Sequence, residues 1–127
     1  MIRNAEIRRI AGAAGVEPRI VELDYALGWA LRGIAANDYL SRRLLFKGGT
    51  CLRKCYFPDH RFSEDLDFTA TEWFGQNDLE DAVAQAFATA SQLSGIDFAA
   101  QAPKVRIIEE EYGRETIRIT HYWRGPH

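Results

Sequence analysis

The hydrophobic positions near the N-terminus repeat with the spacing of an α-helix. Apolar side chains recur every three or four residues at Ile20, Leu23, Leu27, Leu31 and Ile34. This spacing places them on one face of a helix, and Pro18 suits the first turn of that helix. A shorter helix is expected over residues 3–13, because Gly15 then breaks the pattern. We therefore expect N-terminal helices within residues 3–36.

Residues 43–123 predict a second group of elements, in which strands and helices alternate. Strands are expected at the short apolar or alternating runs 43–46, 63–70, 104–108 and 116–123. Helices are expected over TCLRKCYF (50–57) and over the alanine-rich segment 78–94, which has an acidic first turn and stops at Gly95. The EEEYG segment between the last two strands is expected to be a solvated hairpin connection.

This order of elements predicts an α+β fold, a small mixed sheet flanked by helices. With 127 residues and 46% hydrophobic composition, the chain has the size of one ordinary domain with a real core. We expect a single domain over residues 1–127, with N-terminal helices at 3–36 and a core at 43–123. The last strand should alternate, with Ile117, Ile119 and His121 on one face and Thr116, Arg118 and Thr120 on the other.

Charge and composition narrow the class of protein. Sixteen basic and eighteen acidic residues give a net charge of −2, so the protein as a whole is not a cationic nucleic-acid binder. The sequence has no signal peptide and no apolar stretch long enough to cross a membrane, which predicts a cytoplasmic protein with no membrane partner. Cys51 and Cys55 lack further ligands for zinc, and we interpret them as reduced packing residues.

The positive charge is nevertheless concentrated in one segment. Six basic residues and a single acid, Asp59, lie between Arg42 and Arg61. Such runs are usually solvated surface, and a nucleic-acid-binding patch without chemistry is the alternative.

The stretch RFSEDLDF contains two carboxylates at alternate positions. In a strand, Asp65 and Asp67 project to the same face, with Leu66 and Phe68 on the other. Like charges held close repel, and a divalent cation between them would balance the repulsion. Hard oxygen ligands suit Mg²⁺ or Mn²⁺, which bind through one or two carboxylates together with waters and substrate phosphates. The alternative is a pair of aspartates in a solvated loop.

The stretch LLFKGGTCLRK indicates a phosphate-binding turn. Gly48 and Gly49 permit a tight backbone bend and close approach of a phosphate, and Thr50 is placed to cap the next helix or to bond a phosphate oxygen. Neither a Walker A nor a dinucleotide-binding pattern is present, and a merely flexible turn is the alternative. A glycine turn followed by two carboxylates on an adjacent strand is, however, the arrangement that holds a nucleoside triphosphate and its metal.

Residues 44–68, LLFKGGTCLRKCYFPDHRFSEDLDF, resemble the FKGGTxLxK…RFSEDxDF signature of the AbiEii/AbiGii-type nucleotidyltransferase toxins. Upstream, VELDYALGWAL is similar to that family's EKDYxLxxxL helix; we interpret its Glu22, Asp24 and Tyr25 as anchoring the helix. The resemblance implies a minimal polymerase-β-like nucleotidyltransferase core. It also implies a toxin of a toxin–antitoxin or abortive-infection system, which transfers a nucleotide from an NTP, in some members to the acceptor end of tRNA.

The resemblance also implies roles for individual residues. Asp65 and Asp67 match the metal pair, and Arg61 and Ser63 match the entry to their strand, giving four expected catalytic residues. The expected nucleotide-binding residues are Lys47, Gly48, Gly49, Thr50, Arg53 and Lys54.

Two features that the family implies have no counterpart within the 127 residues. These are a third carboxylate on a later strand and a C-terminal helical region with a catalytic lysine. We expect either a fragment or a short form with two metal ligands, and we do not expect Glu109, Glu111 or Glu115 to substitute. A non-catalytic nucleotide-binding module, acting through an antitoxin or as a homo-oligomer that covers a sheet edge, is the alternative function.

Overall fold

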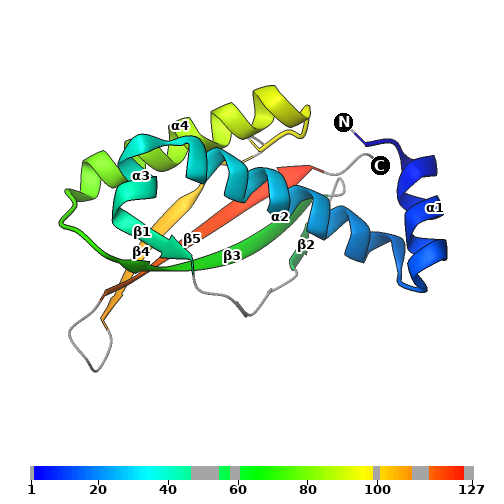
Figure 1. The fold of residues 1–127 in the computed structure, drawn as a ribbon, viewed down its shortest axis with the longest axis horizontal. Helices are drawn as coiled ribbons and strands as arrows, with labels where there is room; N and C mark the ends of the chain where they lie inside the picture. The colour runs from blue at the N-terminus through cyan, green and yellow to red at the C-terminus, as the bar shows by residue number, and fades with distance from the viewer. Residues whose placement is uncertain (1, 47–54, 58–60, 99–100, 110–114, 125–127) are drawn as a thin grey trace.

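The computed structural model describes residues 2–46, 55–57, 61–98, 101–109 and 115–124; for residues 55–57, 61–64 and 109 it describes the backbone alone. The helices are α1 (Asn4–Ala14), α2 (Pro18–Ala36), α3 (Asp38–Arg43) and α4 (Gln76–Ser94). The strands are β1 (Leu44–Phe46), β2 (Cys55–Phe57), β3 (Arg61–Ala70), β4 (Lys104–Glu109) and β5 (Glu115–Arg124). Figure 1 shows α2 and α4 lying across the sheet, with α1 packed at the start of α2.

Local signals set the ends of the long helices. Pro18 occupies the first turn of α2, where its missing N–H is not needed. Gly15 and Gly95 follow α1 and α4 in the left-handed conformation, with φ of 70° and 78°, which glycine adopts without steric cost. The predicted helices at 3–13, from Pro18 to residue 36, and at 78–94 are therefore confirmed.

The short helix α3 is absent from the sequence prediction. Its N-cap is Asn37, whose Oδ1 accepts a hydrogen bond from the backbone N–H of Leu40 at 3.1 Å. The Asn37 side chain also donates to the carbonyl of Ala82 at 3.3 Å, which ties the junction of α2 and α3 to α4. With six residues, α3 is too short to show an apolar repeat, so only its cap residue signals it.

The five strands form one sheet in the order β1-β3-β5-β4, with β2 also paired to β3. The predicted α+β class, a small sheet flanked by helices, is confirmed. The prediction of a mixed sheet is wrong, because all described strand pairs are antiparallel. A parallel neighbour needs a crossover connection, whereas β1 and β3, which have β2 between them in the chain, pair antiparallel.

The predicted helix over residues 50–57 is also wrong where the structure describes it. Cys55–Phe57 is a strand that pairs with β3, with Cys55 opposite Ser63 and Phe57 opposite Arg61. Aromatic residues such as Tyr56 and Phe57 favour strands, and pairing with the edge of β3 satisfies their backbone groups. The remainder of the predicted helix lies outside the described residues, as does most of the EEEYG connection.

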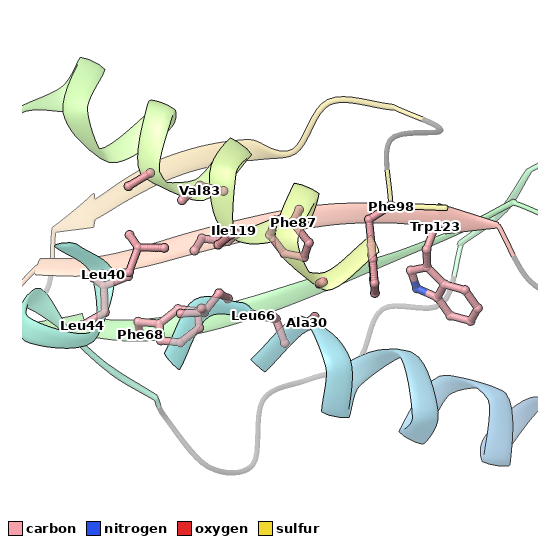
Figure 2. Packing of buried hydrophobic residues seen from close by; sticks show 14 of the residues in the cluster. Ala30, Leu40, Leu44, Leu66, Phe68, Val83, Phe87, Phe98, Ile119 and Trp123 are labelled. Atoms are coloured by element: carbon pink, nitrogen blue, oxygen red, sulfur yellow. The ribbon is translucent and has the colours of Figure 1, made fainter. Parts of the chain in front are cut away.

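The hydrophobic core lies between one face of the sheet and the helices (Figure 2). Leu66 and Phe68 of β3 and Ile117 and Ile119 of β5 point to this side and are at most 2% exposed. Against them pack residues of α2 and α4, including Ala30, Val83 and Phe87. His121 also belongs here, stacked on Phe87 with ring centroids 5.0 Å apart, which agrees with the prediction that it shares a face with Ile117 and Ile119.

Gly33 provides a test of how closely α2 and α4 approach. A Cβ at this buried position would lie 2.5 Å from the carbonyl oxygen of Ala86 and 3.0 Å from Cβ of Ala90. Alanine improves helix propensity by up to about 1 kcal/mol, but the backbone clash costs more. We expect Gly33→Ala to lower the free energy of unfolding by about 1 to 2 kcal/mol in urea denaturation.

Gly28 is the matched control in the same helix, because a Cβ there meets nothing within 4 Å. Gly28→Ala should raise the free energy of unfolding by about 0.5 to 1 kcal/mol. Equal shifts of the same sign in the two variants would contradict the close packing of α2 on α4.

Candidate functional site

Strand β3 presents two carboxylates on the side of the sheet away from the helical layer. Leu66 and Phe68 are buried in the core, and the alternation of side chains turns Asp65 and Asp67 to the opposite face. We call this side, defined by Asp65, Asp67, Arg118 and Thr120, the outer face. The prediction that the two aspartates share one face of a strand is confirmed, and the solvated-loop alternative is wrong.

Asp67 forms a two-pronged ion pair with Arg118 of β5. Arg118 donates from Nε to Oδ1 at 2.8 Å and from Nη2 to Oδ2 at 3.1 Å. The two residues are register partners in the β3–β5 ladder, so their side chains leave the sheet side by side. Both remain accessible, with 35% of the Arg118 side chain and 21% of the Asp67 side chain exposed. The charge of Asp67 is thus already balanced by the protein.

Asp65 has a neutral partner at the next outer-face position of β5. The hydroxyl of Thr120, its register partner, donates to Oδ1 of Asp65 at 2.6 Å. This bond fixes the orientation of the carboxylate without neutralising it. The two aspartates therefore differ: Asp67 is held by a cation and Asp65 by a hydroxyl.

Basic residues extend the outer face across β4. Arg106 lies opposite Arg118, and Lys104 lies opposite Thr120, so two cross-strand rows run from the aspartates to the β4 edge. The Nζ of Lys104 lies 6.0 Å from the ring centroid of Tyr122. The outer face thus combines two carboxylates with neighbouring cations.

Arg61 and Ser63 precede the aspartates on β3 and continue the same alternation of every second residue, but their side chains lie outside the described residues. The other predicted binding residues, Lys47, Gly48, Gly49, Thr50, Arg53 and Lys54, also lie outside them.

The strands that flank segment 47–54 are described. Phe46 at the end of β1 pairs with Phe68, and Cys55 at the start of β2 pairs with Ser63. The two attachment points therefore bracket Asp65 and Asp67 on β3.

Two of the later acidic positions lie away from the aspartates. Glu109 and Glu115 face each other at the end of the β4–β5 ladder, beyond the pairing of Thr116 with Thr69, so neither of these positions lies opposite Asp65 or Asp67. Glu111 lies outside the described residues. In the part of the chain that the structure describes, no group of three or more His, Cys, Asp or Glu residues could hold a metal ion.

Arg43 argues against the basic segment 42–61 as a uniform nucleic-acid patch. Its guanidinium donates to the carbonyls of Trp73 and Tyr39, at 3.0 and 3.1 Å, and lies 3.8 Å from the ring centroid of Tyr39. Arg43 therefore connects α3 to the segment after β3.

Glu22 is buried in α2, while Asp24 is exposed, so of the two only Glu22 fits the predicted anchoring role.

Sequence reasoning missed Arg118 and Thr120 as partners of the aspartates. Arg118 and Thr120 are alternating polar positions in TIRITHYW, as Asp65 and Asp67 are in SEDLDF. This shared alternation was a usable signal, because polar residues on the same face of neighbouring strands can pair. The strand register, which the sequence does not give, decides which polar residues meet.

Residues 29–125 match the family model of the nucleotidyl transferase AbiEii toxin of type IV toxin–antitoxin systems. The chain belongs to the AbiEii family. The resemblance inferred from the glycine and aspartate motifs is confirmed, and the family implies a polymerase-β-like nucleotidyltransferase fold. Comparisons with curated proteins and with solved structures give no significant match.

AbiEii membership carries consequences for substrate and partner. A nucleotidyltransferase uses a nucleoside triphosphate, and a toxin of a type IV system has an antitoxin. Among the helices that the structure describes, none has the length and apolar character needed to span a bilayer.

Proposed function

We propose that this AbiEii chain transfers a nucleotide from an NTP to an acceptor such as tRNA, using Asp65 and Asp67 to bind Mg²⁺ or Mn²⁺. The observation that carries the proposal is the placement of both carboxylates on the outer face, each held by a β5 side chain. In the reaction an acceptor hydroxyl oxygen forms a bond to the α-phosphorus as the bond to pyrophosphate breaks. The hydroxyl proton passes to solvent.

The donor set fits such a cation. Mg²⁺ takes oxygen ligands and needs only one or two carboxylates when substrate phosphates and waters complete its shell. A carboxylate has about four lone-pair sites, and the contacts described above use one on Asp65 and two on Asp67. When bound, the cation would neutralise the charge of the triphosphate during in-line attack.

The remaining predicted residues complete the proposal. The turn at Gly48, Gly49 and Thr50 would hold the triphosphate, with Lys47, Arg53 and Lys54 nearby in sequence. Arg61 would offset phosphate charge, and Ser63 would lie on the carboxylate face. The strand pairings support this assignment, because Phe46 and Cys55, the described residues that flank segment 47–54, pair with β3 on either side of the aspartates.

Incubation of the purified chain with each α-³²P-labelled NTP, Mg²⁺ and a mixed tRNA pool tests the proposed reaction. We expect label to enter RNA of tRNA size, to depend on the divalent cation and to disappear with EDTA. Label that stays entirely in free nucleotide, across all four NTPs and with both Mg²⁺ and Mn²⁺, would contradict transfer to tRNA.

A non-catalytic module is the second candidate function. It is favoured by the Arg118–Asp67 ion pair and by β5, which places arginine and threonine rather than an acid opposite the aspartates. Such a module would bind an NTP, an antitoxin or a second copy of itself without covalent transfer. Nucleotide binding seen by calorimetry, together with no labelled RNA, would favour this candidate.

A further inference from the structure

Arg118 lies between opposite charges on the outer face. On one side it is bonded to Asp67, and on the other its register partner is Arg106 of β4. Like charges directly opposite on neighbouring strands are unfavourable, whereas a fork-shaped guanidinium–carboxylate pair is among the stronger polar contacts. The contact with Asp67 is therefore the favoured position of this side chain in the unliganded protein.

The same contact opposes cation binding. Both oxygens of Asp67 accept hydrogen bonds from Arg118, and a divalent cation on these oxygens would lie close to the guanidinium charge. The partial exposure of both side chains leaves Arg118 room to move away. Thr120 places no such charge beside Asp65.

We propose that Arg118 competes with the divalent cation for Asp67 and releases this carboxylate when the anionic triphosphate offers its guanidinium another partner. This inference rests on the proposed function, in that it takes Asp65 and Asp67 as the cation site. Arg118 thereby makes tight cation binding depend on nucleotide. The exchange is reciprocal, because groups that compete for one carboxylate weaken each other's binding equally.

Binding of Mn²⁺ alone, followed by the decrease of its free EPR signal, tests the competition without measuring transfer. We expect Arg118→Gln to bind Mn²⁺ about fivefold more tightly than the parent, a change of the size of one accessible ion pair. Arg118→Lys should fall between the two, because an ammonium cannot form the two-pronged contact. Circular dichroism and thermal melting establish whether each variant is folded. If Arg118→Gln is unfolded, the Mn²⁺ affinity of Arg118→Lys still tests the competition.

Arg106→Gln is the matched control. It removes the same charge from the neighbouring position of the outer face, beside Arg118 rather than Asp67. An equal gain in Mn²⁺ affinity for Arg106→Gln and Arg118→Gln would mean a general field effect and would overturn the proposal. Unchanged or weaker binding in folded Arg118→Gln would also overturn it, as would a gain that survives an added Asp67→Asn substitution, because the contested carboxylate is then absent.

A second measurement of Mn²⁺ affinity, made in the presence of a non-hydrolysable NTP analogue, tests the release of Asp67. In the parent, the analogue should raise Mn²⁺ affinity more than it does in Arg118→Gln, because only the parent must release Asp67. Equal enhancement would overturn the exchange step. If Arg118→Gln behaves as expected but no NTP is transferred by any variant, the competition stands and the proposed transferase function fails.

Discussion

Asp65→Asn should abolish nucleotidyl transfer, lowering kcat/KM by about a thousandfold while leaving the fold intact. Asparagine matches the shape of aspartate, and its carbonyl oxygen still accepts the 2.6 Å hydrogen bond that Thr120 donates. What it loses is the negative charge that binds the cation. Electrostatic stabilisation by a bound cation contributes several kcal/mol, and about 4 kcal/mol corresponds to a thousandfold change in rate. Label transfer from NTP, measured under single-turnover conditions, gives the ratio.

Asp81→Asn is a suitable control for this substitution. Asp81 is an exposed carboxylate on α4, the helix that packs on the core side of the sheet, so its loss changes the net charge equally without touching the outer face. It should retain the parent's activity and cation dependence. An Asp65→Asn protein that keeps more than a tenth of the parent's rate would disprove the assignment of Asp65 as a metal ligand.

Most elements with a local signal are predictable from this sequence. The apolar repeat and Pro18 define α2, the positive-φ Gly95 closes α4, and the alternation of TIRITHYW gives the two faces of β5 correctly at Ile117 and Arg118. The error at Cys55–Phe57 has a physical cause. A three-residue strand has too little periodicity to identify, and its conformation depends on pairing with β3.

The site is predictable only in part, for the same reason. Alternation alone places Asp65 and Asp67 on one face of a strand. The partners of these carboxylates depend on register between segments that are far apart in sequence, 55 residues for Thr120 and 51 residues for Arg118. A shift of one residue between β3 and β5 would turn the partners to the core side, and the hydrophobic pattern of both strands excludes that shift.

Leu66→Ala is expected to cause a large loss of stability, because Leu66 is fully buried between the two aspartate positions of β3. Removing a buried leucine side chain costs its transfer free energy and leaves a cavity in the core cluster, next to its register partner Ile119. We expect the free energy of unfolding to fall by about 3 kcal/mol and Tm to fall by about 10 °C. Leu93→Ala on α4, where the side chain is 58% exposed, should change the free energy of unfolding by less than about 0.5 kcal/mol. Urea denaturation of both variants measures the two losses. Similar losses would show that Leu66 does not face the core, and the outer-face position of Asp65 and Asp67 would then be wrong as well.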